Sequence, residues 1–314
     1  MSRASRHPVA TVLGTAATGV LLWSTLVERR LFTIRRHSLP LLETGAAPIR
    51  VLQLSDLHLA PWQSNKINWV RSLAQLRPDL VVLTGDLMGH LQARGSLLEA
   101  LRPLARTGAP VVFVHGSNDY YGPILKNPLR YLAEPSRKST RQQDIDNAAL
   151  TRGLEELGCI NLNNSATRLE IRGTRVELLG LNDPHIRYDD ASAMRTELAA
   201  LTAEDGEDGP ETAPLRIGVV HAPYQEALGE LLDDGAGLIL AGHTHGGQVR
   251  MPGVGALTSN CDLPTAQARG LSVWYDAHRA AYLNVSAGLG NSIYAPVRFA
   301  CRPEASLITL EAAR

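Results

Sequence analysis

Acidic, amide and imidazole side chains recur along this 314-residue chain, each time shortly after an apolar segment. The five groups are Asp56 with His58, Asp86, Asn118 with Asp119, His221, and His243 with His245. Any one of them is common by chance, but five at the same place relative to an apolar run are hard to explain as surface decoration. Burying carboxylates and imidazoles together is costly unless a cation compensates for the lost hydration. The pattern therefore predicts a metal site.

The apolar runs before these groups are typical of strands buried on both faces of a sheet. They predict strands at Ile49–Leu54, Asp79–Leu83, Pro110–Val114, Leu215–Val220, Leu238–Ala241, Tyr282–Ser286 and Ser306–Leu310, and a hairpin of Ser165–Ile171 with Arg175–Leu181. Helical spacing predicts helices at Ile67–Leu76, Ser96–Leu104 and Asp144–Leu157. Open α/β sheets place their functional sites at the carboxyl ends of strands, so we expect the five polar groups to meet there.

The spacing within two groups favours joint binding of one cation. Asp56 and His58 lie two residues apart, and so do His243 and His245. Residues i and i+2 of an extended segment point to the same side of the chain. All these ligands are nitrogen and oxygen atoms, which suit Mn²⁺, Fe or Zn²⁺ and do not suit metals that thiolates select.

The composition narrows the class of protein. Apolar residues make up 44% and charged residues 20% of the chain, which is enough for a large core and excludes wholesale disorder. Basic and acidic residues number 31 each, so no overall field attracts nucleic acid, and we expect no nucleic-acid partner. The three cysteines lie far apart, which excludes a disulfide scaffold and a cysteine-rich zinc site.

An uncharged run from Pro8 to Val27 opens the chain after a short basic segment. About 20 residues suffice for a helix to cross the hydrocarbon core, so the run predicts a membrane anchor. A cleaved signal peptide is disfavoured because an Arg-rich stretch follows at once, whereas a helix lying on the domain or on the bilayer surface remains an alternative. The arginines after the run outnumber those before it, which favours a cytoplasmic catalytic domain under the positive-inside rule.

The ordered motifs resemble those of the calcineurin-like metallophosphoesterase superfamily from Val51 to Val249; they are Asp56-x-His58, Gly85-Asp86, Gly116-Ser117-Asn118-Asp119, His221 and Gly242-His243-x-His245. The resemblance implies a four-layer αββα sandwich, of the α/β (α+β) class, with two metal ions at the strand ends. Arg29–His58 and Asn127–Tyr131 further resemble a membrane-associated bacterial branch with an apolar amino-terminal helix. We expect an anchor helix and linker at residues 1–46 and a phosphoesterase domain at residues 47–314.

The resemblance also implies a role for each motif residue. The first divalent ion would be held by Asp56, His58 and His245, and the second by Asn118, His221 and His243. The carboxylate of Asp86 would bridge the two ions. A hydroxide that bridges the ions would attack phosphorus in a phosphodiester or pyrophosphate. No covalent enzyme intermediate would be needed.

The third motif departs from the family pattern. Family members usually carry Gly-Asn-His-Asp or Gly-Asn-His-Glu there, whereas this chain has Ser117 and Asn118 at the two central positions. Serine is a poor neutral ligand, so we expect Asn118 to coordinate through a shifted turn and the usual histidine to be missing. His115 and His185 are the nearest replacements, although a structural or substrate-contacting role suits either one. We name His185 and Asn118 as the candidate catalytic residues.

These features predict a phosphoester hydrolase. Its substrate would be a small-molecule phosphoester or, because the site would lie near a membrane, a lipid-linked or envelope phosphoester. Arg130, Arg187 and Arg298 are candidates for phosphate contacts, with surface solvation as the ordinary alternative. The rival function is a metal-binding, membrane-associated scaffold with little or no turnover, which the altered third motif supports.

Overall fold

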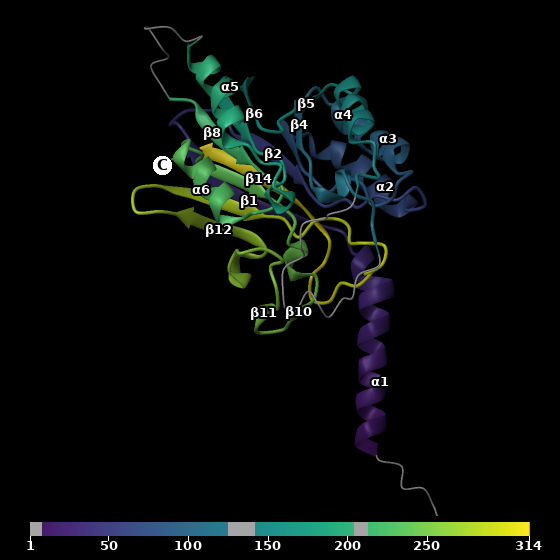
Figure 1. Ribbon diagram of the computed structural model, residues 1–314. Coiled ribbons are helices and arrows are strands. Elements are labelled where there is room, and N and C mark those ends of the chain that lie inside the picture. Colours follow the sequence, from purple (N-terminus) through teal and green to yellow (C-terminus); the bar gives the residue numbers. More distant parts are fainter. Residues whose placement is uncertain (1–7, 125–141, 204–212, 314) are drawn as a thin grey trace, which may run out of the picture.

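Two six-stranded sheets lie face to face, and helices cover the outer face of each sheet (Figure 1). The computed structural model describes residues 8–124, 142–203 and 213–313. This arrangement of helix, sheet, sheet and helix confirms the predicted four-layer sandwich. Asn127–Tyr131 and Arg130, which carried two of the expectations above, lie outside the described residues.

The first sheet brings together strands from both ends of the chain. Its order is β1 (Thr33–Leu42), β14 (Glu304–Ala312), β2 (Ile49–Leu54), β3 (Leu80–Thr84), β4 (Val111–Val114) and β5 (Cys159–Asn161). The strands from β2 to β5 run parallel, whereas β14 is antiparallel to β2 and parallel to β1. The parallel part places three of the polar groups at one edge, directly after β2, β3 and β4.

The second sheet repeats this plan with the other two groups. Its order is β12 (Gly270–Tyr275), β13 (Ala280–Val285), β9 (Leu238–Ala241), β8 (Leu215–Val219), β7 (Thr174–Gly180) and β6 (Ser165–Ile171). Strands β7, β8, β9 and β13 run parallel, and β6 and β12 close the sheet as antiparallel edges. His221 follows β8 and His243 follows β9.

Apolar side chains fill both faces of the central strands. Val51 and Val82 of the first sheet meet Val219 and Leu240 of the second, and all four are fully buried. The alternate residues of the first sheet face its helices, α2 (Ser64–Ser72), α3 (Arg94–Ala105) and α4 (Asn147–Glu156). Helices α5 (Ala191–Ala203) and α6 (Gln225–Asp233) cover the second sheet in the same way. Burial on both faces explains why these strands read as continuous apolar runs rather than as alternating patterns.

Two features differ from the sequence-based expectations. Thr33–Leu42, which fell in the expected linker, forms the edge strand β1 and pairs along its length with β14. The sequence does not indicate this strand, because an edge strand exposes one face to water and its basic residues interrupt the apolar run that marks a buried strand. Helices α5 and α6 were not predicted at all. The division into residues 1–46 and 47–314 stays a prediction, but strand β1 belongs to the first sheet.

The amino-terminal helix α1 (Pro8–Leu22) projects away from the sandwich (Figure 1). It continues through a π-helical turn, Trp23–Val27, and a 3₁₀ turn, Glu28–Arg30. By length and composition, this helix could cross a membrane. Its last turns are docked on the domain, because Glu28 is buried and accepts a hydrogen bond from the backbone nitrogen of Cys301 at 2.6 Å.

Candidate metal centre

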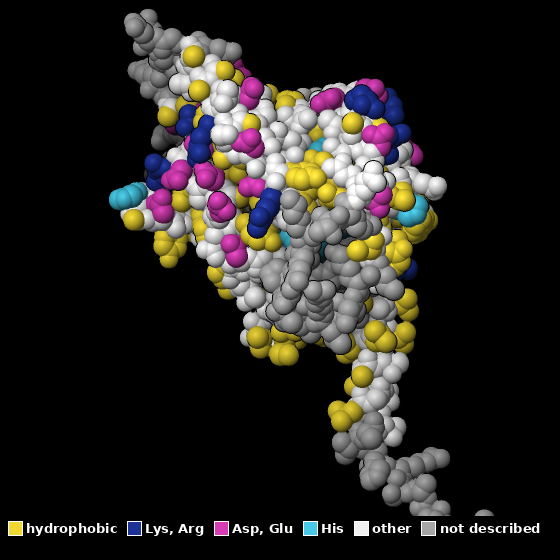
Figure 2. Space-filling view, viewed as in Figure 1, with side chains coloured by type: hydrophobic (Ala, Val, Ile, Leu, Met, Phe, Trp, Pro, Cys, Tyr) yellow, Lys and Arg dark blue, Asp and Glu magenta, His cyan; other side chains and the backbone are white. Residues whose placement is uncertain are grey.

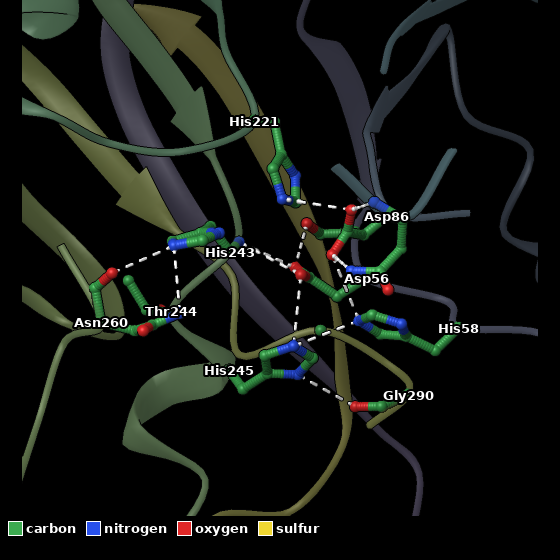
Figure 3. A network of polar contacts seen from close by, with 12 residues as sticks. Asp56, His58, Asp86, His221, His243, Thr244, His245, Asn260 and Gly290 are labelled. Carbon is green, nitrogen blue, oxygen red and sulfur yellow. Dashed lines mark hydrogen bonds and ion pairs between the residues drawn. The ribbon is translucent and has the colours of Figure 1, made fainter. Parts of the chain in front are cut away.

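Side chains from both sheets converge at the shared edge of the sandwich, as Figure 3 shows. Asp56 and His58 follow β2, Asp86 follows β3, and His245 follows β9. One ligand atom from each of these four residues lies within 4.8 Å of the others. The structure therefore brings together the expected first-ion ligands and the expected bridging carboxylate.

The imidazoles of this cluster face one another across a gap that suits a cation. The Nε2 atoms of His58 and His245 are 3.2 Å apart. His58 Nε2 is also 3.4 Å from Asp86 Oδ2, and His245 Nε2 is 3.6 Å from Asp56 Oδ1. Two carboxylates and two ring nitrogens that point at one another match the donor set of a first-row divalent ion.

Backbone carbonyls fix the orientation of three histidine rings. His245 Nδ1 donates to the carbonyl of Gly290 at 3.1 Å, His221 Nδ1 to that of Thr84 at 2.7 Å, and His243 Nε2 to that of Asn260 at 3.2 Å. A carbonyl oxygen only accepts hydrogen bonds, so in His245 and His221 the nitrogen facing it carries the hydrogen, whereas His243 Nε2 also lies 3.2 Å from the side-chain amide nitrogen of Asn260. In the neutral ring the other nitrogen then presents its lone pair, which is how metal-binding histidines are commonly held.

His221 shows most directly that a positive charge fits here. Its Nε2 atom is buried, makes no hydrogen bond among the described residues and lies 3.5 Å from Asp86 Oδ1. Burial opposes protonation, but the charges of Asp86, Asp183 and Asp56 outweigh it and raise the pKa of His221 well above its ordinary value. Either a proton or a metal ion between the ring and the carboxylate would satisfy this demand.

The other protonation states also suit metal ligation. Burial lowers the pKa of His58 to about 4, so this ring is neutral at neutral pH. Burial alone would raise the pKa of Asp86, but its contacts, led by His221, hold that pKa well below the usual range. Burial raises the pKa of Asp56 to about 6. The central carboxylate is therefore an anion beside a neutral imidazole.

The third motif places Asn118 beside the central carboxylate. Its backbone nitrogen donates to Asp86 Oδ1 and its amide nitrogen donates to Asp86 Oδ2, both at 2.7 Å. Asp119 braces this turn, since its carboxylate accepts from the backbone nitrogens of Leu87, Met88 and Gly116. The amide nitrogen of Asn118 faces the cluster here, so coordination through its oxygen requires the amide to turn over.

The backbone at the ligands adopts a conformation that side-chain-bearing residues seldom take. Positive φ angles occur at five of the seven expected ligands, namely Asp56, His58, Asp86, His243 and His245. Such strain is typical of functional sites, where the surrounding structure imposes it. Gly116 shows how tight the site is, because a Cβ atom there would lie 2.7 Å from His221 Nε2. Nothing in the amino-acid pattern indicates these angles.

The two histidines considered as replacements lie in different places. His185 borders the cluster, with its ring centroid 4.6 Å from that of His243 and its Nδ1 atom 3.0 Å from the hydroxyl of Tyr224. His115 instead contacts Thr151 of α4 through Nε2 at 2.8 Å, on the helix-covered side of the first sheet. Only His185 is placed to meet a substrate in the cluster.

Arg298 has a role that the sequence did not reveal. Its side chain is 0% exposed and donates to the carbonyls of Ala287, Gly288, Gly290 and Cys301, so it is not available to bind phosphate. It holds the loop whose Gly290 carbonyl orients His245. Of the other two arginine candidates, Arg187 is exposed and Arg130 is not described.

Comparison with known proteins gives the same family. Residues 49–247 match the calcineurin-like phosphoesterase family. The chain belongs to this family. It is 27% identical over 279 residues to the uncharacterized protein YpbG of Bacillus subtilis, with 88% of this chain and 87% of that protein covered. It is 26% identical over 283 residues to the phosphodiesterase YaeI of Escherichia coli, covering 89% of this chain and 88% of that protein.

A further relative contains a membrane-spanning part. The transmembrane protein with metallophosphoesterase domain of Danio rerio is 27% identical over 213 residues, covering 64% of this chain and 41% of that protein. Family membership makes this chain a hydrolase of phosphoester bonds. Together with the cluster of aspartates and histidines, it indicates a dinuclear metal site.

Proposed function

We propose that the protein is a membrane-anchored phosphodiesterase or pyrophosphatase that uses two divalent ions. The observation that carries the proposal is the position of Asp86, which His58, His221 and Asn118 contact from three different loops. A carboxylate with partners on both sides is suited to bridging a pair of ions. When bound, the ions would supply Lewis acidity, which lowers the pKa of a water and neutralises charge on the phosphoryl group.

In this proposal each side chain keeps the role that the family resemblance implied. The first ion is held by Asp56, His58 and His245, and the second by Asn118, His221 and His243. Asp86 bridges the two ions. The carbonyl contacts of His221, His243 and His245 hold the three rings in position. Because those rings are fixed before substrate arrives, little reorganisation is needed during the reaction.

The substrate that we propose is a lipid-linked or envelope phosphoester. The support is the apolar helix α1, whose end is docked on the same domain that carries the site. We place the catalytic domain in the cytoplasm, because arginines are more frequent after the helix than before it. Soluble phosphodiesters are the alternative substrates.

The direct test is metal analysis combined with a panel of substrates. Full-length protein in detergent micelles should contain two divalent ions per chain and hydrolyse a phosphodiester or a pyrophosphate. A chelator should remove both the ions and the activity, and Mn²⁺ or Zn²⁺ should restore them. Stable binding of two ions without turnover of any monoester, diester or pyrophosphate would favour the scaffold function instead.

His185 is expected to assist departure of the leaving group. His185→Ala should lower kcat for a phosphodiester with an alkyl leaving group by about 100-fold, because general acid catalysis is worth that much or more. The same change should alter kcat for an activated nitrophenyl diester by less than about threefold, since that leaving group needs no proton. Comparison of the two substrates under saturating conditions measures the effect.

Tyr224→Phe is the matched control, because it removes only the hydroxyl that contacts His185 Nδ1. It should leave the ring of His185 in place and give a smaller loss than His185→Ala. An equal loss of kcat for both substrates in His185→Ala would refute a role in proton donation and indicate a structural one.

A further inference from the structure

A short apolar hairpin continues directly from the metal-binding loop. After His245 the chain forms β10 (Arg250–Met251) and β11 (Gly255–Ala256), which pair in antiparallel fashion. Met251 is 51% exposed, Val254 71% and Leu257 42%. We call Val249–Leu257 the hairpin. It packs few of its apolar side chains against the domain, so its tip is available to a partner.

The hairpin is connected to the end of the amino-terminal helix by one segment of chain. At the hairpin, the backbone nitrogen of Phe299 donates to the carbonyl of Gln248 at 3.1 Å. The carbonyl of Phe299 accepts from the backbone nitrogen of Arg250 at 2.9 Å. One residue earlier, the backbone nitrogen of Arg298 donates to the carbonyl of Ser24 at 3.0 Å. The docked end of the helix and the base of the hairpin are thus held by neighbouring residues.

The hairpin and α1 extend from the same end of the domain (Figure 1). Figure 2 shows apolar side chains at that lower edge of the domain and on the upper part of the helix. No aspartate or glutamate occurs in the sequence from Gly246 to Cys261, although the whole chain has 31 such residues. A surface without acidic groups is not repelled by the anionic lipids of a membrane leaflet.

We propose that the hairpin is a second contact with the lipid bilayer, inserted into its interfacial region beside the anchor helix. This inference rests on the proposed function, because it assumes that α1 lies in a membrane. Each exposed apolar side chain that leaves water for the bilayer favours this contact. With two points of contact, the domain can no longer rotate freely about a single helix.

The consequence concerns the substrate. His245 and Val249 are four residues apart, so insertion of the hairpin holds the metal centre close to the lipid headgroups. The favoured substrate class is an amphiphilic phosphoester whose lipid part stays in the bilayer while its phosphoryl group enters the site. A soluble phosphoester would gain nothing from this arrangement.

Site-specific fluorescence tests the contact. The three native cysteines are buried, so Val254→Cys can be labelled selectively with an environment-sensitive dye. Tyr275→Cys is the matched control, because Tyr275 is 72% exposed and pairs with Ala280 at the opposite end of the sheet from the metal centre. Both full-length variants would be reconstituted into vesicles of phosphatidylcholine and phosphatidylglycerol.

We expect a blue-shifted emission and quenching by nitroxide-labelled lipids in the Val254→Cys variant and neither in the Tyr275→Cys variant. Equal, water-like behaviour of the two dyes would overturn the proposal. So would a blue shift in Val254→Cys that is already present in micelles at high protein concentration and disappears on dilution, because a second copy of the chain would then cover the hairpin. Neither readout depends on catalytic activity.

A second variant connects the contact to turnover. Met251→Ser combined with Val254→Ser changes only exposed side chains, so folding should be preserved. We expect kcat/KM for a phosphoester lipid in vesicles to fall about tenfold or more, in line with the loss of two apolar insertions, while kcat for a soluble nitrophenyl diester stays the same. Equal rates of wild type and variant on the lipid would contradict the proposal. Absence of all hydrolysis in wild type would instead count against the proposed function, and the fluorescence result would still stand.

Discussion

Replacing Asp86 with asparagine is expected to lower kcat/KM by about a thousand-fold or more and to remove metal from both positions. The Asp86 carboxylate contacts ligands of both expected ions, since it lies beside His58, His221 and Asn118. Asparagine keeps the size of the side chain but loses the negative charge that both ions need. Metal content by mass spectrometry and turnover of a nitrophenyl diester should fall together.

Asp79→Asn is the control for this substitution. Asp79 precedes β3, whereas Asp86 follows it, so the two residues lie at opposite ends of one strand. Asp79 forms ion pairs with Arg50 and Arg172 at 3.5 Å and is remote from the cluster. Its variant should keep both ions and full activity. Retention of two ions and normal turnover in Asp86→Asn would refute the bridging role.

Arg298→Met is expected to destabilise the folded protein by about 3–5 kcal/mol and to weaken metal binding by about 10–100-fold. The guanidinium group is completely buried and donates to four backbone carbonyls. Methionine fills the space of the aliphatic part but removes all of these hydrogen bonds from the loop. Because the Gly290 carbonyl orients His245, the loss should extend to the first ion.

Urea unfolding of the metal-free protein and a metal titration with a competing chelator measure the two effects separately. Arg302→Met is the matched control, since Arg302 is exposed and donates to one backbone carbonyl, that of Leu31, at 3.1 Å. It should change stability by less than about 0.5 kcal/mol, as surface substitutions commonly do. If Arg298→Met bound the metal as tightly as Arg302→Met, the proposed link between this arginine and the metal centre would be wrong.

The strand ends and their polar groups could be predicted from sequence because two simple signals coincide there. A fully buried parallel strand needs apolar residues on both faces, and an aspartate or histidine directly after it has few structural uses. Asp56, Asp86 and His221 each lie two residues after such a strand, and His245 lies four residues after one. The structure places Asp56, Asp86 and His245 in one cluster with His221 beside Asp86, and the family comparison independently identifies a phosphoesterase.

Other features depend on contacts between distant parts of the chain, which no local pattern contains. The carbonyls of Thr84, Asn260 and Gly290 orient the histidines, yet a carbonyl looks the same at every residue. Arg298 resembled a phosphate-binding residue because arginine is normally exposed, and only the fold shows it enclosed. Strand β1 was assigned to a linker because its partner, β14, lies at the other end of the sequence.

The position of β14 also determines when the domain can form during synthesis. In the first sheet β14 lies between β1 and β2, so these two strands do not pair with each other and the sheet is completed only when β14 has been synthesised. Until then β1 and β2 each present an unpaired edge, which is the kind of surface that recruits foreign strands. A nascent chain whose apolar helix has already entered a bilayer would be tethered during this wait, and tethering separates such edges from those of neighbouring copies.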